Sequence, residues 1–195
     1  MNFIELSFYS LTWLVIIYIF NCVLANKIIK PEPMVLLLYS SCVALLGIYG
    51  EVLVGTVYES LFGIKLWEYR LLPIHDAYTS VYSLFVWSFY GFHLYLLHSS
   101  LNEKKERSAT FLALLLGVEA MILEVLFNVS YLFITGAYIF YYFPNDIFHL
   151  TSVQALPIYI VAGYLIPRAI RKMRDDPRSF ILLNYTLIFI FIFLT

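Results

Sequence analysis

The sequence is poor in charge and lacks the short motifs that mark several common enzyme classes. Only 13% of its 195 residues are charged, against about 25% in an average soluble domain. The patterns CxxC, HExxH, GxxxxGK[ST] and GxGxxG are all missing, so no zinc, nucleotide or dinucleotide site is indicated by motif. We therefore expect no cofactor.

Cysteine is scarce, and basic residues are missing from the first positions of the chain. Cys22 and Cys42 both lie in apolar runs, so we interpret them as small packing residues rather than as a disulfide or a metal pair. Glu5 stands where a signal peptide would carry positive charge. We expect the first apolar run to remain as a helix.

Apolar residues make up 62% of the chain and gather in runs of about 20 residues, the length that spans a bilayer as a helix. These runs predict an all-α, polytopic membrane protein with a single transmembrane domain over residues 1–195 and six spanning helices. The helices are expected at about 7–26, 33–62, 77–99, 109–134, 150–170 and 180–195. The domain divides into a first helix (1–32), two hairpins (33–99 and 109–170) and a last helix (179–195).

Lysine and arginine are distributed unevenly between the two sides that six spans define. Ten of the twelve follow the first, third and fifth spans, while Lys65 and Arg70 follow the second. The positive-inside rule then places both termini outside the plasma membrane. We interpret the basic runs as topology signals, with recognition of lipid headgroups as the alternative, and expect no nucleic-acid partner.

Glycine and glutamate alternate along the second span, where Gly47, Glu51, Gly55, Glu59 and Gly63 form one stripe on a helix. Glycine there allows a neighbouring helix to approach closely. A carboxylate there must face a neighbour or a wet cavity, because an acidic residue at the bilayer centre costs about 2.5–3.5 kcal/mol on insertion scales.

The two hairpins also resemble each other. The sequence from Thr79 (TSVYSL) matches that from Thr151 (TSVQAL), and the sequence around Glu59 (YESLF) matches that around Glu124 (LEVLF). Both hairpins run from inside to outside and back, which predicts parallel repeats related by a pseudo-two-fold axis along the membrane normal. Glu59 and Glu124 are then expected to face each other in the outer half of the bundle.

The candidates for a cavity are the intramembrane carboxyls and the polar and aromatic residues near them. They are Glu51, Glu59, Glu119, Glu124, Trp67, Glu68, Tyr69, Arg70, Asn128 and Gln154. Such carboxyls serve proton transfer, cation binding or acid–base chemistry; the alternative is that they only join helices by hydrogen bonds. The loop from Trp67 to Arg70 is either an interfacial aromatic belt or a lid over the cavity.

Four further polar residues lie in the two outer loops: His75, Asp76, Asp146 and His149. They would suit a transition metal only if the loops meet, and no local ligand spacing supports such a site. We therefore expect no metal site. Asp76 and Asp146 are expected instead to cap the starts of the helices that follow them.

These motifs resemble a family of small multi-pass membrane proteins labelled ABC-transporter permeases. The matching residues are Glu59, Trp67-Glu68-Tyr69, Glu124 and the TSVQAL segment from Thr151, within residues 50–163. The resemblance implies a helical membrane fold and a separate ATPase subunit, because this chain has no ATP-binding segment. A fainter similarity is to membrane carotenoid-biosynthesis proteins, which pair a helix glutamate with a glycine- and aromatic-rich loop.

The sequence favours a transporter-like membrane protein with an outward-facing acidic cavity, either a permease or the membrane subunit of a complex. Two alternatives stay open. One is a membrane-embedded enzyme that performs acid–base chemistry on an isoprenoid or lipid, and the other is an assembly subunit without turnover. The expected partners are the lipid bilayer and either a partner subunit or further copies of this chain.

Overall fold

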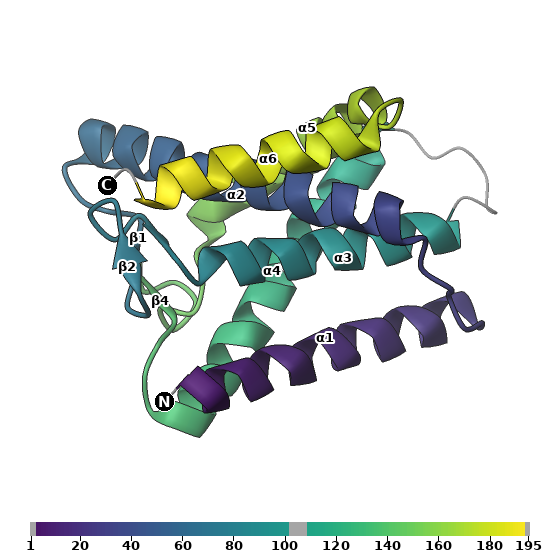
Figure 1. Ribbon diagram of the computed structural model, residues 1–195. Helices are drawn as coiled ribbons and strands as arrows, with labels where there is room; N and C mark the ends of the chain where they lie inside the picture. Colours follow the sequence, from purple (N-terminus) through teal and green to yellow (C-terminus); the bar gives the residue numbers. More distant parts are fainter. Residues whose placement is uncertain (1–2, 102–108, 194–195) are drawn as a thin grey trace.

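The computed structural model describes residues 3–101 and 109–193, most of which form helices that run lengthwise past one another (Figure 1). The helices are α1 (Phe3–Ala25), α2 (Pro33–Phe62), α3 (Ser83–Leu101), α4 (Ala109–Thr135), α5 (Leu156–Met173) and α6 (Pro177–Phe193). Between them lie the short strands β1 (Trp67–Tyr69), β2 (Pro73–Ile74), β3 (Thr79–Ser80) and β4 (Phe140–Tyr142), and a 3-10 turn, η1 (Val153–Ala155).

Four stretches in the described residues are long and apolar enough to cross a membrane, and a fifth helix is apolar but shorter. The four are Ile4–Ala25, Pro33–Phe62, Thr110–Thr135 and Val153–Met173, and the shorter helix is Pro177–Phe193. The helix α3 is not among them, because its serine, tyrosine and histidine residues dilute its apolar content. The described residues therefore form an all-α membrane protein with four candidate spans, and the expected number of six spans stays a prediction.

The outer surface of the bundle is apolar, as a lipid environment requires. On α1, for example, Ile4, Phe8 and Val23 are each more than 70% exposed, and Phe133 on α4 is 91% exposed. A soluble monomer rarely leaves such large apolar patches in water. Contact with the bilayer accounts for them.

Basic residues flank the turns at one end of the bundle. The turn after α1 carries Lys27 and Lys30, the turn after α5 carries Arg174, and Arg178 follows in the first turn of α6. The start of α1 and the end of α6 lie at the other end, with the strands (Figure 1). The remaining basic loop, with Lys104, Lys105 and Arg107, lies outside the described residues.

The helices α2 and α4 end in the same way. Gly63 and Gly136 both adopt φ 72°, in the left-handed region that favours glycine. Each donates its N–H to the carbonyl four residues earlier, of Glu59 and Leu132 respectively, at 2.8 Å. These C-caps turn the chain out of each helix and into a strand.

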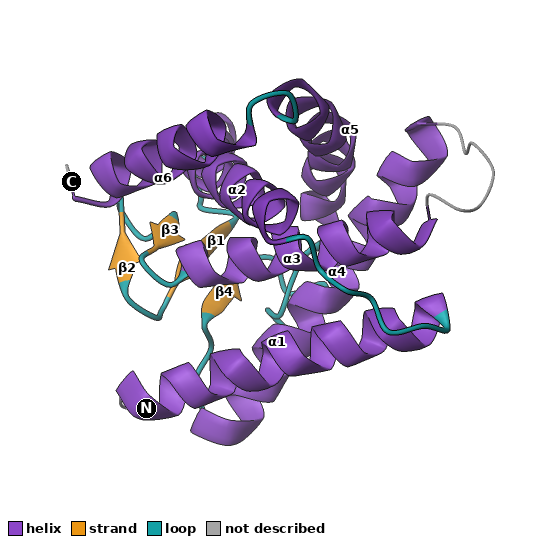
Figure 2. Cartoon of the chain, turned by 45° about the vertical axis from the view of Figure 1, so that its right-hand side comes forward, coloured by secondary structure: helices purple, strands orange, loops and turns teal. Residues whose placement is uncertain are grey.

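The strands β1 and β4, which follow these caps, pair antiparallel with each other, and we call the pair the ribbon. Its register joins Trp67 to Tyr142, Glu68 to Tyr141 and Tyr69 to Phe140. Figure 2 shows the strands at one end of the helix bundle. Four ribbon side chains point inward and are at most 7% exposed: Trp67, Tyr69, Phe140 and Tyr142.

The third and fifth spans begin later than the sequence predicted. Thr79 and Ser80, expected inside a helix, form β3 and pair with Ile74 and Pro73 of β2. Ser80 Oγ donates to the carbonyl of Leu71 at 2.5 Å and accepts the N–H of Tyr82 at 2.9 Å. These local bonds compete with helical ones, so α3 begins only at Ser83. Similarly, η1 precedes α5.

Glycines allow close approach within each hairpin. A Cβ on Gly91 would lie 2.6 Å from the carbonyl oxygen of Tyr39, and one on Gly163 would lie 3.0 Å from that of Ala113. Two glycines of α2 were predicted to let a neighbouring helix backbone approach, but they face side chains instead. Gly47 and Gly55 make room for aromatic rings, those of Trp87 and Tyr78.

Candidate functional site

Glu51 is a buried carboxyl on α2, with 8% of its surface exposed. It accepts hydrogen bonds from the hydroxyls of Tyr69 and Thr79. The indole Nε1 of Trp87 donates to the same carboxyl at 2.9 Å. The three donors come from β1, β3 and α3, so this one side chain ties the outer loop and the next helix to α2.

Glu124 on α4 has a matching set of donors. The hydroxyl of Tyr142 donates to it at 2.8 Å, and that of Thr151 at 2.5 Å. The hydroxyl of Tyr159 lies 3.2 Å from that of Tyr142. Tyr69 follows Glu51 by 18 residues, and Tyr142 follows Glu124 by the same 18. The threonine donors follow by 28 and 27 residues.

Both ribbon phenols remain protonated and act as donors. Burial, and then the nearby Glu51 carboxyl, raise the pKa of Tyr69 well above its ordinary value. Burial and the Glu124 carboxyl do the same to the pKa of Tyr142. Hydrogen bonds to an ionised carboxyl are about twice as strong as neutral ones, so these donors prepare each site for a carboxylate.

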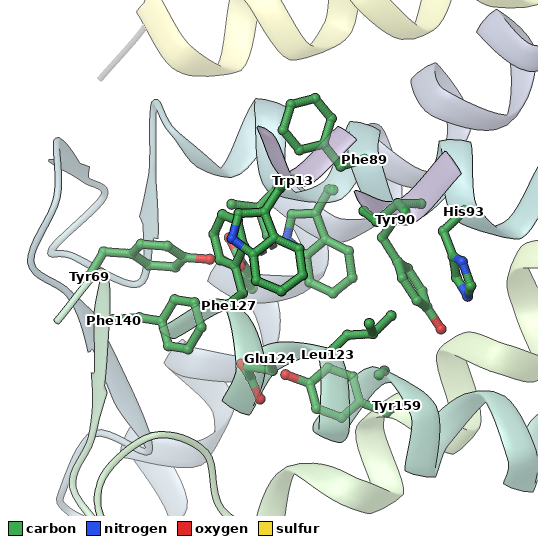
Figure 3. Close-up of a pocket in the computed structure, with 15 residues that line it drawn as sticks. Trp13, Tyr69, Phe89, Tyr90, His93, Leu123, Glu124, Phe127, Phe140 and Tyr159 are labelled. Atoms are coloured by element: carbon green, nitrogen blue, oxygen red, sulfur yellow. Dashed lines mark hydrogen bonds between the residues drawn. The ribbon is translucent and has the colours of Figure 1, made fainter. Parts of the chain in front are cut away.

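Two cavities meet at these carboxyls. The larger has a volume of about 770 Å³ and lies between α2, α5 and α6, beneath the ribbon. The smaller has a volume of about 90 Å³ and lies between α1, α3 and α4. Figure 3 shows the smaller cavity, with Tyr69 and Phe140 at one side and His93 at the other. Residues that line both are Glu51, Tyr69, Trp87, Glu124, Phe140 and Tyr159.

The cavity walls are acidic and aromatic. Across residues 3–101 and 109–193, no lysine or arginine lines either cavity. Besides the two carboxyls, the wall of the larger cavity is mostly hydrocarbon, with residues such as Val54, Ile158 and Ile166. Two carboxyls in an apolar space without a basic partner favour the binding of a proton or a cation.

The larger cavity opens sideways, between α2 and α5. Leu53 on α2 is 67% exposed although it lines the cavity, and Val161 and Leu165 on α5 are also more than half exposed. On the loop side, the buried ribbon residues cover the carboxyls. The outward-facing opening that the sequence favours stays a prediction.

Glu59 does not face Glu124, which corrects the expected pairing. Its carboxyl accepts a hydrogen bond from Tyr78, which raises the pKa of that phenol to about 12. It lines neither cavity. Glu51 lies opposite Glu124 instead, and it precedes the C-cap Gly63 by as many residues as Glu124 precedes its own.

The remaining cavity candidates separate into residues at the cavities and residues away from them. Glu68 and Arg70 form a pair at 2.5 Å, and Arg70 lies 5.5 Å from the ring of Tyr141. Neither Glu68 nor Arg70 lines a cavity. Trp67 does line the larger cavity. Gln154 is exposed and accepts a hydrogen bond from Tyr58.

Asn128 is fully buried and joins the loop after α4 to the helix. Its amide nitrogen donates to the carbonyls of Phe140 at 2.8 Å and Leu150 at 3.3 Å. Its amide oxygen accepts the N–H of Ile139 at 3.1 Å. It therefore supports the ribbon rather than the cavity wall.

The four candidate metal ligands in the outer loops do not come together in one site. His75 stacks on Phe191 at 4.1 Å, whereas His149 stacks on Tyr141 at 4.3 Å. Within the part of the chain that the structure describes, no three His, Cys, Asp or Glu residues could hold a metal ion. Asp146 accepts the N–H of Val153 at 2.9 Å and the hydroxyl of Ser152, the N-cap of η1, at 3.0 Å, so it supports the start of η1, close to its predicted role. The carbonyl of Asp76 accepts a hydrogen bond from Lys65.

Sequence reasoning missed the donors that hold the carboxyls. They are Thr79, Trp87, Tyr142 and Thr151, together with Tyr159, whose hydroxyl lies within hydrogen-bond distance of that of Tyr142. Their signal was recurrence: each donor to one carboxyl has an equivalent for the other, at nearly the same distance along the chain.

The chain matches no protein-family model, no curated protein and no solved structure, so the resemblance to small permeases stays a prediction.

Proposed function

We propose that this chain is a transporter-like membrane protein that takes a lipid-soluble organic cation from the bilayer into the larger cavity. The observation that carries the proposal is the presence of Glu51 and Glu124 together in one apolar cavity without a lysine or arginine in its wall. A bound cation supplies the charge that the two carboxyls lack.

Aromatic side chains complete this site. Trp67, Trp87 and Tyr159 line the larger cavity beside the carboxyls. An organic cation gains about 2 kcal/mol or more over the face of such a ring when water is excluded. The hydrocarbon wall and the opening between α2 and α5 suit a ligand that arrives through the bilayer.

The proposal includes a plasma-membrane location, six spans and both termini outside. It also includes an internal duplication, in which α2–α3 corresponds to α4–α5. The matching donors of Glu51 and Glu124 and the matching caps Gly63 and Gly136 support this duplication.

The orientation can be tested by labelling. A cysteine placed at Arg174 should stay unlabelled by an impermeant maleimide in intact cells. Labelling from outside would reverse the orientation.

Binding of tetraphenylphosphonium to detergent-purified protein tests the proposal by calorimetry. We expect Glu51→Gln and Glu124→Gln each to weaken binding at least about tenfold, a loss of about 1.4 kcal/mol, because glutamine keeps the shape but not the charge. Glu59→Gln is the matched control and should change little. No binding to the wild type, or equal binding by all three variants, would refute the proposal.

A second function, favoured by the hydrocarbon wall opposite the two carboxyls, is acid–base chemistry on an isoprenoid. A carboxylic acid can protonate an alkene, and the aromatic rings would stabilise the resulting carbocation. Such an enzyme would change the lipid extract of cells that express it, and Glu51→Gln should abolish that change. An unchanged extract argues for transport.

The resemblance to permeases adds a further expectation. If the chain acts as the membrane subunit of an ABC-type complex, it should co-purify with a separate ATPase in stoichiometric amounts. Recovery of a homo-oligomer without a second protein would instead favour a transporter driven by an ion gradient.

A further inference from the structure

A second polar cluster, in which two of the three side chains are fully buried, lies between α1, α3 and α4. His93 on α3 is 1% exposed, and its Nε2 lies 3.1 Å from a carboxyl oxygen of Glu119 on α4. Its Nδ1 lies 2.8 Å from the amide nitrogen of Asn21 on α1. Three helices thus contribute one side chain each to the cluster.

The hydrogen bonds of Asn21 determine where the proton of His93 lies. The amide nitrogen of Asn21 also donates to the carbonyl of Ile17 at 2.8 Å, which fixes that nitrogen as the donor in both contacts. The Nδ1 of His93 must then accept. A neutral His93 carries its hydrogen on Nε2, the ring nitrogen nearest Glu119.

This cluster contains most of the unpartnered buried polar atoms among residues 3–101 and 109–193. They include Asn21 Oδ1, His93 Nε2 and Glu119 Oε2, none of which has a well-formed hydrogen bond. Leaving such an atom unsatisfied costs about 1–3 kcal/mol. Helix packing alone does not explain why these polar atoms are left without partners. A carboxylate that accepts a proton needs an oxygen that is free of hydrogen bonds, as Oε2 of Glu119 is.

The smaller cavity connects this cluster to the site of the proposed function. Glu51, Glu124 and His93 all line it. Figure 3 shows His93 at one side, with Tyr90 between it and Glu124. The cavity's 90 Å³ holds about three waters at roughly 30 Å³ each. Glu119 does not line the cavity and is reached past the ring of His93.

The charges around His93 come from few groups. From α4 it faces Glu119, and from α1 the uncharged Asn21. Within α3, Tyr90 stacks on it at 6.1 Å, and His98 interacts with it electrostatically. An extra proton on the Glu119 carboxylate would therefore neutralise the nearest negative charge to His93.

We propose that Glu119 is an inner proton acceptor, positioned by His93 and Asn21, that receives the proton displaced from Glu51 or Glu124. The inference rests on the proposed function. When a cation binds, one carboxylic acid of the outer pair loses its proton to water in the smaller cavity. The proton then moves past the ring of His93 to Oε2 of Glu119, whose carboxylate becomes a carboxylic acid. Proton and charge balance at each step.

The direction of this transfer follows from the helices. Glu119 precedes Glu124 on α4 and so lies nearer the end of the bundle that carries Lys27 and Arg174. A path of outer carboxyl, water and inner carboxyl leads the proton away from the ribbon. Chains of acidic and histidine side chains serve as proton relays in pumps and transporters.

Infrared difference spectroscopy tests the inference through the carboxylic-acid C=O stretch. On addition of tetraphenylphosphonium, the wild type should lose one such band, from the outer pair, and gain another, from Glu119. Glu119→Gln should lack the gained band, and His93→Gln should shift it. Glu59→Gln is the control and should keep both bands.

A pH-difference spectrum without ligand separates this inference from the proposed function. It should show a titrating carboxyl band that is lost in Glu119→Gln and shifted in His93→Gln, whether or not the cation binds. If the wild type binds no cation but shows this behaviour, the proposed function fails and Glu119 remains a proton acceptor. Wild-type bands retained in Glu119→Gln, in either experiment, overturn the inference.

Discussion

Replacement of Asn128 by alanine should loosen the loop that carries β4. The side chain is fully buried and makes three hydrogen bonds to the backbone, and alanine would remove all of them. The N–H of Ile139 would then be buried without that acceptor, at a cost of about 1–3 kcal/mol. Loss of the two bonds to carbonyls adds about 1 kcal/mol, because the bond to Leu150 is long at 3.3 Å.

We expect a total loss of about 3 kcal/mol in the free energy of unfolding. For a chain of this size, each kcal/mol lowers Tm by about 2–4 °C, so Tm should fall by about 6–12 °C. Thermal unfolding in detergent, followed by near-ultraviolet circular dichroism, measures this shift. The ribbon also covers Glu124, so tetraphenylphosphonium binding should weaken as well.

Two further variants make the test specific. Asn145→Ala changes an exposed asparagine in the same loop and should leave Tm unchanged. Asn128→Asp keeps an acceptor for Ile139 but turns a second oxygen toward the carbonyls of Phe140 and Leu150, so it should be at least as destabilising as alanine. A Tm for Asn128→Ala equal to that of Asn145→Ala would refute the reasoning.

Two other predictions concern the packing and capping of helices. Gly91→Ala should cost about 1–3 kcal/mol, because its Cβ would lie 2.6 Å from the carbonyl oxygen of Tyr39, whereas Gly50→Ala, with open space around its Cβ, should not lower Tm. Hydrogen bonds from Ser179 lower the pKa of Asp176, so its contribution to stability is present above the ordinary Asp pKa of about 4 and is lost as the pH falls through the lowered value. Asp176→Asn should therefore melt below the wild type at neutral pH and level with it in acid, and equal Tm values at neutral pH would contradict this.

The helices could be predicted because their signals are local. The second span was expected at 33–62, and α2 has those bounds, because a proline begins it and a glycine in the left-handed conformation follows it. The ribbon could not be predicted. Its three residue pairs join a segment that precedes α3 in the chain to one that follows α4. Strands of three residues are also too short to show a periodic pattern.

The site was predicted in part. Glu51, Glu124, Trp67 and Tyr69 were all candidates, and the structure brings them to one cavity. Glu59 was paired with Glu124 because the residues beside them are alike. The spacing to the C-cap glycine carries more information than this likeness, because it fixes both the depth and the direction of a side chain on its helix.

The ribbon has a consequence for how the chain enters the membrane. Because β1 and β4 come from different hairpins, the first loop cannot close its hydrogen bonds until α4 and the segment after it have been synthesised and inserted. Until then, the peptide groups of Trp67–Tyr69 and the acid of Glu51 are without their final cover. A nascent chain stopped within α4 would therefore expose an unpaired strand edge, the kind of surface that membrane chaperones retain and quality-control proteases recognise.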